Sequence, residues 1–240
     1  MQPDVLDRDQ AELAHLGSLG RQALLARDDV SLVEGRDVEV FLVFDFLSDA
    51  ECRSFVRTID SGASPSTLYK GTEVEGFRTS DTCHFAGGDP LVAEIDARLS
   101  RLLAMDSGLG EPLQGQRYRP GEQFKPHNDY FHEGTRYWEV ERSAGQRTWT
   151  AMAYLNEVDG GETRFPAAGL SISPTPGMLV VWNNMDRDGR PNPATLHAGT
   201  PVSSGTKYVL TKWYRQLPYQ RRIDHALALQ ASGTNLELVV

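Results

Sequence analysis

The sequence lacks the features that mark membrane-spanning and secreted proteins. Its longest apolar runs, such as Met178 to Trp182, are far shorter than the roughly 20 residues that cross a bilayer as a helix. The first residues, Met1 to Asp4, carry an acid and lack the apolar core of a secretory signal. We therefore expect no membrane partner and a cytoplasmic location.

Cysteine and positive charge are also scarce. Cys52 and Cys83 lie on segments typical of a helix and a strand, and neither belongs to a CxxC motif, so we expect reduced packing residues. The sequence has 24 Lys and Arg residues and 33 Asp and Glu residues, which gives a formal net charge of -9. This balance argues against a nucleic-acid partner, because phosphate binding requires a basic surface. No Pro/Gly/Ser-rich linker divides the 240 residues, which favours one large domain.

The first part of the chain predicts helices around one strand. Residues 1–35 place scattered leucines among charges, which indicates a helical extension of one or two amphipathic helices that packs on the main domain. Residues 38–46 are apolar on both faces and predict a strand covered on both sides. A capping box from Ser48 to Glu51 and the pair Asp89-Pro90 precede apolar residues at helical spacing, and each predicts a helix.

Short strand-like stretches bounded by turn residues follow the second of these helices. They cover residues 114–118, 123–129, 148–155, 170–173, 178–182, 195–202 and 207–214. Short strands behind a helical face indicate an α+β domain with a β-sandwich or jelly-roll core.

We expect this domain to occupy residues 36–216, after the extension of residues 1–35 and before a C-terminal extension of residues 217–240. A short helix is predicted at residues 223–229. The apolar end, residues 236–240, predicts either an added strand or contact with a second subunit, so a homodimer is a candidate assembly.

A candidate metal site comes from His127 and Asp129, which are two residues apart on a predicted strand. Residues i and i+2 of a strand share a face, so the imidazole and the carboxylate can converge. They would supply two members of the two-histidine, one-carboxylate set that holds non-haem Fe(II). His197 begins a strand-turn-strand unit and can face the His127 strand across a sandwich to complete the set. Alone, each histidine is more typical of a surface residue than of a metal ligand, so the assignment depends on the two occurring together with Lys207.

A candidate anion anchor, Lys207, lies ten residues after His197 and shares a strand face with Val209, Thr211 and Trp213. An inward lysine is costly unless it pairs with an anion. This face suits a dicarboxylate such as 2-oxoglutarate, whose keto-acid end could chelate the iron and leave a position for O2. Arg215 is the alternative cation.

In order and spacing, these stretches resemble the 2-oxoglutarate- and Fe(II)-dependent dioxygenases of the prolyl 4-hydroxylase type. The matching stretches cover roughly residues 38–215 and are Arg78 to Ser80, Tyr118 to Gly121, Pro126 to Phe131, Arg147 to Leu155, Gly160 to Pro166, Pro176 to Trp182, and His197 to Trp213.

The resemblance implies a double-stranded β-helix (jelly-roll) core with iron ligands at His127, Asp129 and His197 and with Lys207 on the cosubstrate. It makes Tyr118 and Thr150 candidate contacts of the cosubstrate or of the iron ligands, although a structural hydroxyl explains each equally well. Trp213 would either line the pocket or fill the core. The implied cofactors are Fe(II), 2-oxoglutarate and O2, with ascorbate as a further candidate.

The implied reaction is hydroxylation of an unactivated carbon, with proline in a peptide or protein as the favoured substrate. Residues 130–146, which include Tyr137 and Trp138, resemble the loop that closes over a peptide, and Arg78 would help to hold an extended chain. Two alternatives stay open: a hydroxylase of a free amino acid or other small molecule, and a non-catalytic metal- or sugar-binding jelly roll. An inward Lys207 disfavours the second, and the acidic charge disfavours a nucleic-acid demethylase.

Overall fold

The computed structural model describes residues 5–35, 37–66, 76–135 and 138–232. Its helices are α1 (Val5–Leu25), α2 (Asp49–Gly62), α3 (Pro90–Leu102), α4 (Trp138–Glu141) and α5 (Gln220–Ala231). Its strands are β1 (Val30–Gly35), β2 (Val38–Val43), β3 (Ser64–Pro65), β4 (Asp81–His84), β5 (Gln114–Tyr118), β6 (Phe124–His127), β7 (Arg147–Tyr154), β8 (Asp159–Gly160), β9 (Thr163–Phe165), β10 (Leu170–Ile172), β11 (Leu179–Asn183), β12 (His197–Gly199), β13 (Val202–Ser204) and β14 (Lys207–Arg215). Within the described ranges, no helix has the length and apolar character that a membrane crossing requires.

Two antiparallel sheets form the core. The larger has the strand order β1-β2-β11-β7-β14-β5-β4-β3, and the smaller has the order β10-β9-β12-β6. Phe165 and Ile172 of the smaller sheet share one buried cluster with Tyr154 and Val180 of the larger, so the two sheets pack face to face. The predicted α+β jelly-roll fold is confirmed.

The two-residue period of a strand divides the large sheet into an outer and an inner face. On β7, Trp149, Ala151 and Ala153 pack in the cluster that includes the helices. Met152 and Tyr154, which alternate with them, pack in the cluster between the sheets. The inner face therefore looks into the jelly roll.

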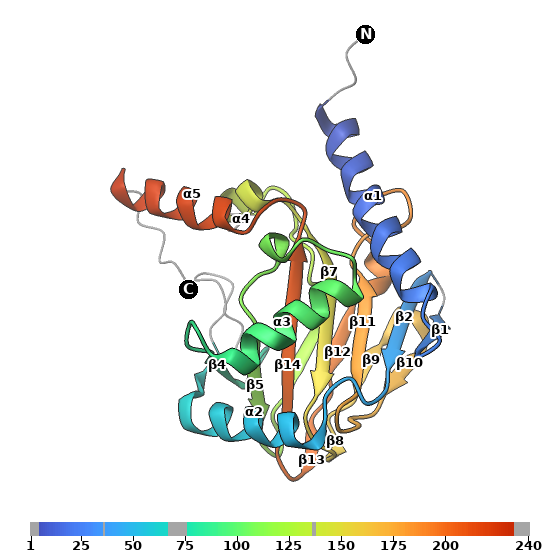
Figure 1. Ribbon diagram of the computed structural model, residues 1–240, viewed down its shortest axis with the longest axis vertical. Helices are drawn as coiled ribbons and strands as arrows, with labels where there is room; N and C mark the ends of the chain where they lie inside the picture. The colour runs from blue at the N-terminus through green and yellow to red at the C-terminus, as the bar shows by residue number, and fades with distance from the viewer. Residues whose placement is uncertain (1–4, 36, 67–75, 136–137, 233–240) are drawn as a thin grey trace.

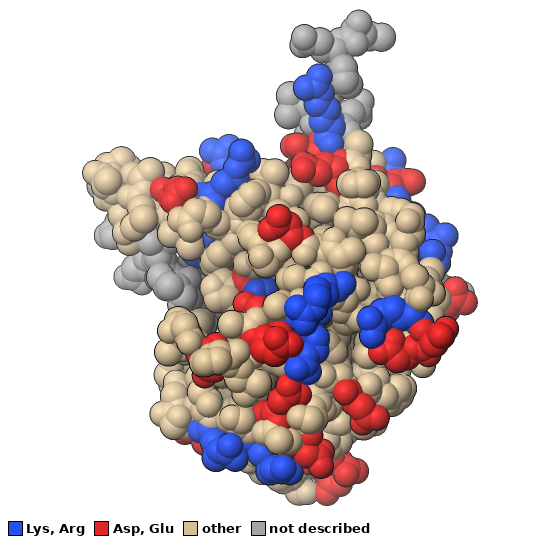
Figure 2. Space-filling view, in the orientation of Figure 1, with Lys and Arg blue, Asp and Glu red and all other residues tan. Residues whose placement is uncertain are grey.

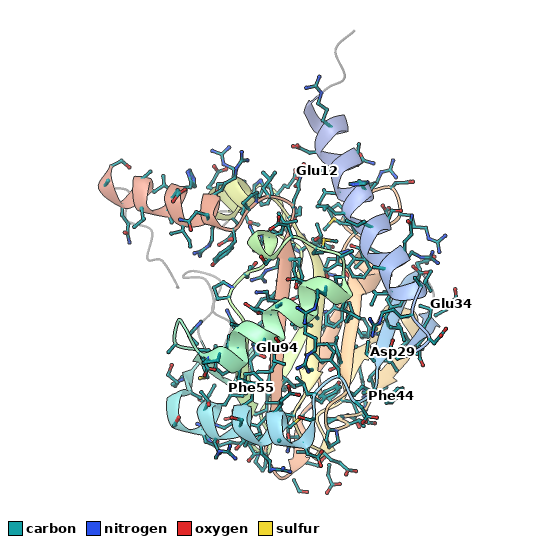
Figure 3. The ribbon with its side chains drawn as sticks, in the orientation of Figure 1. Glu12, Asp29, Glu34, Phe44, Phe55 and Glu94 are labelled. Carbon is teal, nitrogen blue, oxygen red and sulfur yellow. The ribbon has the colours of Figure 1, made fainter. Side chains whose placement is uncertain are left out.

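Three helices cover the outer face of the large sheet (Figure 1). The predicted start of α2 is confirmed, because Ser48 and Glu51 form a reciprocal capping box. The predicted start of α3 is also confirmed, since the Asp89 carboxylate accepts from the Leu91 and Val92 amides. Phe55 of α2 (Figure 3) is 2% exposed and meets the Phe85 ring edge-on at 5.4 Å.

The sequence patterns missed several short elements. The described residues 5–35 contain one helix and then the strand β1. This strand pairs with β2 as the half-buried edge of the large sheet and so carries too few apolar residues to stand out. Strands β8, β9 and β13 are two or three residues long, too short for a periodic pattern. The predicted helix at residues 223–229 is confirmed within α5, and the apolar end at residues 236–240 lies outside the described residues.

Cys52 and Cys83 are both buried with free thiols, as predicted. On the face of the molecule seen in Figure 2, acidic and basic side chains are interspersed and form no continuous basic surface.

Helix α1 packs on the main domain, as predicted, through two glycines that permit a close approach. The Trp149 indole N–H donates to the Leu16 carbonyl at 3.2 Å. A Cβ atom on Gly17 would lie 2.5 Å from the Asn183 amide nitrogen, and one on Gly20 would lie 2.7 Å from the Trp149 ring. Leu13 continues this contact in a separate cluster with Tyr130 and Met185.

We expect Gly20→Ala to destabilise the protein, although the same change in an exposed helix stabilises it by about 1 kcal/mol. The added methyl group would meet three atoms of the buried Trp149 indole at 2.7–2.9 Å. Such overpacking costs about 1–3 kcal/mol of the free energy of unfolding, which urea titration measures. The control is Ser18→Ala at an exposed position of the same helix, which we expect to change this free energy by less than about 0.5 kcal/mol. A Gly20→Ala protein more stable than the wild type would contradict the packing of α1.

Candidate metal centre and cosubstrate pocket

Two histidines from neighbouring strands and one carboxylate meet on the inner side of the small sheet. His127 of β6 is directly opposite His197 of β12 in the strand register, and their ring centroids are 4.3 Å apart. One Asp129 carboxylate oxygen lies 3.9 Å from His127 Nε2, and the other lies 3.8 Å from His197 Nε2. The predicted convergence of the three residues is therefore seen. The predicted position of His197 was wrong, because this residue lies beside His127 in the same sheet and not across the sandwich.

The hydrogen bonds of the two imidazoles leave their Nε2 atoms free to bind a metal. His127 Nδ1 is 2.8 Å from the Lys125 carbonyl, and His197 Nδ1 is 3.0 Å from the Thr195 carbonyl. A carbonyl oxygen can only accept, so each Nδ1 carries the proton and each Nε2 presents its lone pair. The three donor atoms of His127, Asp129 and His197 lie within 4.8 Å of one another. This set of two imidazoles and one carboxylate fits Fe(II).

The protonation states also suit metal binding. Burial, reinforced by the neighbouring His197, holds the pKa of His127 well below its usual range, so its imidazole is neutral. Burial alone would raise the pKa of Asp129, but His197, His127 and Arg147 outweigh it and the pKa is lowered. The Thr150 hydroxyl donates to Asp129 Oδ2 at 2.7 Å, which also stabilises the carboxylate. Thr150, a predicted contact, therefore lies directly behind the carboxylate of the candidate metal site.

Aromatic rings enclose both histidines. The Phe124 ring stacks on His127 with a centroid distance of 3.6 Å. The rings of Trp182 and Phe165 contact His197 at 4.8 Å and 5.5 Å. These rings limit the rotation of the imidazoles and exclude water from their apolar faces, so the donor atoms are held in place before any metal binds.

Lys207 points into the jelly roll from the start of β14 and is 3% exposed. Its ammonium group donates to the Gly161 carbonyl at 2.7 Å and lies 5.3 Å from the ring centroids of both Tyr118 and Tyr154. Burial lowers the pKa of Lys207 to about 7, with Glu162 acting in the opposite direction. A Cβ atom on Gly199, two residues after His197, would lie 3.9 Å from this ammonium group. Lys207 therefore lies beside the strand that carries His197 of the candidate metal site.

The other predicted pocket residues lie on the same inner surface. Tyr118 pairs with Lys207 in the strand register and is buried. Trp213 is buried, and its indole N–H has no hydrogen-bond partner among the described residues. Arg78 is half-buried, with its guanidinium group 4.9 Å from the Phe124 ring centroid, and it donates to the Ser80 hydroxyl. Partial removal from water lowers its pKa.

A buried ion network, which the sequence patterns did not reveal, lies next to this pocket. Arg147 donates two hydrogen bonds to Glu111 and lies 4.0 Å from the Trp213 ring centroid. Burial alone would raise the pKa of Glu111, but Arg147 and Arg215 lower it to about 2. Arg215 also donates to Glu141 and is fully buried, so it is not available as the alternative cation for a cosubstrate. An arginine that opens an apolar strand, as Arg147 does, was the only sequence signal for this network.

The network anchors part of the predicted loop of residues 130–146. The Gln146 side chain bonds both the amide and the carbonyl of Phe131, at 2.8 Å and 2.9 Å. Glu141 accepts from Arg215 and Arg222 at 3.0 Å each. Trp138 is half-buried, with its ring 6.3 Å from that of Phe131, and Tyr137 lies outside the described residues. Both ends of the loop are thus held before any substrate is present.

Comparisons with known proteins agree with this geometry. The family model for the 2OG-Fe(II) oxygenase superfamily matches residues 113–215, which contain the candidate metal-binding triad and Lys207. Prolyl 4-hydroxylase 1 of Arabidopsis thaliana is 33% identical over 199 residues, which span 74% of this chain and 69% of that protein.

Solved structures extend the match to the fold. The viral collagen prolyl hydroxylase of Paramecium Bursaria Chlorella virus-1, solved as a 2OG complex, is 28% identical, with a TM-score of 0.59 over 73% of this chain and 95% of that chain. A prolyl hydroxylase from Trichoplax adhaerens, solved with a peptide fragment of hypoxia inducible factor, has a TM-score of 0.57 over 92% of this chain and 97% of that chain. At 17% identity it supports the fold alone. The chain belongs to the prolyl 4-hydroxylase type of 2-oxoglutarate- and Fe(II)-dependent dioxygenases.

Proposed function

We propose that this dioxygenase hydroxylates proline residues in a peptide or protein, with Fe(II) held by His127, Asp129 and His197. In this proposal Lys207 binds the distal carboxylate of 2-oxoglutarate. The observation that carries the proposal is the presence of a two-histidine, one-carboxylate set and an inward lysine inside the same jelly roll. The relatives named above, which are prolyl hydroxylases, support the choice of proline.

The side chains supply binding, orientation and exclusion of water. Bound iron, together with 2-oxoglutarate and O2, supplies the oxidising chemistry that no side chain of the protein provides. Lys207 would exchange its hydrogen bond to the Gly161 carbonyl for a charge-assisted hydrogen bond to the cosubstrate. The rings of Tyr118 and Tyr154 flank the ammonium group and lower the local dielectric constant, which strengthens that bond.

Support for a peptide comes from the donors near the triad. The N–H of the buried Trp213, which has no partner among the described residues, and the guanidinium group of Arg78 could donate to the carbonyl groups of an extended chain. The loop of residues 130–146 borders the same region through Phe131, which lies 5.0 Å from the Arg147 guanidinium group. A free amino acid or other small molecule is the competing substrate. Ascorbate as a cofactor, a homodimer and a cytoplasmic location stay predictions from the sequence.

We expect His197→Ala to weaken Fe(II) binding more than about 100-fold, because the loss of a ligand exceeds the 10- to 100-fold effect typical of a residue behind one. Equilibrium dialysis under anaerobic conditions measures this affinity, and circular dichroism checks the fold. His84→Ala, which changes an exposed histidine on β4, is the matched control and should bind Fe(II) as the wild type does. Equal affinity in the His197→Ala and wild-type proteins would disprove the metal site.

We expect 2-oxoglutarate binding to weaken as the pH rises above 7. The cosubstrate carboxylate pairs with the protonated Lys207, whose pKa without ligand is about 7, so binding above this pH requires uptake of a proton. The Kd should be nearly constant below pH 6 and should rise by up to about tenfold per unit above pH 7. Calorimetric titration of the Mn(II)-loaded protein from pH 5.5 to 9 measures it.

Lys207→Arg is the control for this pH dependence, because a guanidinium group stays protonated throughout the range. Its Kd should not follow the same rise. A wild-type Kd that is constant between pH 7 and 9 would show that Lys207 does not carry the charge that binds the cosubstrate.

We expect a proline-containing peptide to be hydroxylated with a higher kcat/KM than free proline, because an extended chain can use the donors beyond the triad. Mass spectrometry of the products measures both. Peptide together with metal and 2-oxoglutarate should also protect residues 132–135 and 138–140 from hydrogen exchange, since these lie between the anchors at Phe131 and Glu141. A higher kcat/KM for free proline would assign the enzyme to the small-molecule hydroxylases.

A further inference from the structure

A chain of three buried hydrogen bonds ends on the metal-binding carboxylate. The Trp182 indole N–H donates to Asn184 Oδ1 at 3.0 Å. The Asn184 amide nitrogen donates to the Thr150 hydroxyl at 2.9 Å, and this hydroxyl donates to Asp129 Oδ2 at 2.7 Å. Trp182, Asn184 and Thr150 are each at most 1% exposed, so water does not compete for these bonds.

The chemistry of the four groups permits only one direction of donation along this chain. An indole N–H can only donate, so Asn184 must present its oxygen to Trp182 and its amide hydrogens to Thr150. A hydroxyl group has one hydrogen, and a carboxylate can only accept. The Thr150 hydroxyl therefore accepts a hydrogen bond from Asn184 and donates one to Asp129. The orientation of Asn184 thus determines where the Thr150 hydrogen points.

The rigid sheet holds the first members of this chain. Trp182 of β11 is paired with Thr150 of β7 in the strand register. The Asn184 backbone amide donates to the Thr148 carbonyl at 2.7 Å, and its own carbonyl accepts from the Asn192 amide at 3.0 Å. Since the backbone of Asn184 is bonded on both sides, its side chain can serve as a fixed support.

We propose that Asn184 is a positioning residue of the metal centre, which acts through Thr150 to hold the Asp129 carboxylate at one rotation. With Oδ2 bonded to Thr150, Oδ1 stays turned toward His127, 3.9 Å from its Nε2 atom. Trp182 links the two halves of the site, because the same ring contacts His197 at 4.8 Å. The inference rests on the proposed role of the triad in metal binding.

Substitutions can break this chain of hydrogen bonds while leaving the volume of each side chain nearly unchanged. Asn184→Asp keeps the shape of the side chain but removes the amide that donates to Thr150, so the hydroxyl is no longer directed by its neighbour. Thr150→Val removes the hydroxyl, and Thr150→Ser restores it. Thr148→Val is the matched control, because Thr148 lies two residues earlier on β7, is equally buried and donates to the Tyr214 carbonyl at 3.0 Å without contacting the triad.

The test is titration of the purified, metal-free protein with Co(II). The visible absorption of bound Co(II) measures binding, and thermal unfolding checks the fold. We expect Asn184→Asp and Thr150→Val to weaken Co(II) binding about 10- to 100-fold, as is typical when the support of a ligand is lost. Thr150→Ser should recover affinity to within about threefold of the wild type, and Thr148→Val should lower stability but not affinity. If Asn184→Asp does not fold, the comparison of Thr150→Val with Thr150→Ser gives the decision.

The outcomes separate this inference from the proposed function. A wild-type protein that bound no Co(II) would contradict the metal site itself. A wild type that bound Co(II) no more tightly than the Asn184→Asp and Thr150→Val proteins would overturn the positioning role alone. The same conclusion would follow if Thr148→Val weakened binding as much as Thr150→Val, because the effect would then be a general loss of packing.

Discussion

The central strands of the large sheet bury both of their faces, and the rest of the structure depends on this constraint. Each strand must supply apolar residues to the helices outside and must fill the space between the sheets inside. On β7, Trp149 meets α1 while Thr150, the next residue, bonds Asp129. A single strand thus couples the docking of the N-terminal helix to the metal centre. A shift of one residue in its register would exchange the two faces and abolish both contacts.

Because the inner face is buried, a polar group on it is costly unless it has a hydrogen-bond partner. Thr211 donates to the Gln116 side chain at 2.7 Å, and Thr150 donates to Asp129 at the same distance. Lys207 has one carbonyl partner and two aromatic neighbours, which leaves its charge incompletely compensated. The Trp213 N–H has none among the described residues. The proposed function gives Lys207 to the cosubstrate and the Trp213 N–H to the peptide.

The ion network beside the candidate site fixes the loop of residues 130–146, which has little regular secondary structure of its own. Buried charges are tolerated there because each carboxylate has at least two arginine partners, such as Arg147 and Arg215 on Glu111. The same network reaches Glu141 and, through it, helix α5. This arrangement confines any closure over substrate to the few residues between the anchors. The C-terminal helix is thereby tied to the loop that borders the pocket.

The sequence by itself determined whatever depends on neighbours along the chain. The capping residues start α2 and α3, and the two-residue spacing keeps Asp129 close to His127. The predicted strand is shorter than expected, because β6 ends at His127 and Asp129 lies in the bend that follows. Only the tertiary structure decided what depends on the pairing of distant strands. It placed His197 beside His127 in the same sheet, and it engaged Arg215 in ion pairs, which left Lys207 as the inward cation beside β12. It also directed Thr150 toward Asp129 and the glycines of α1 toward Trp149. The physical reason is that local spacing determines which face a side chain occupies, whereas its partner on that face is set by strand register and helix packing, which no single stretch of sequence contains.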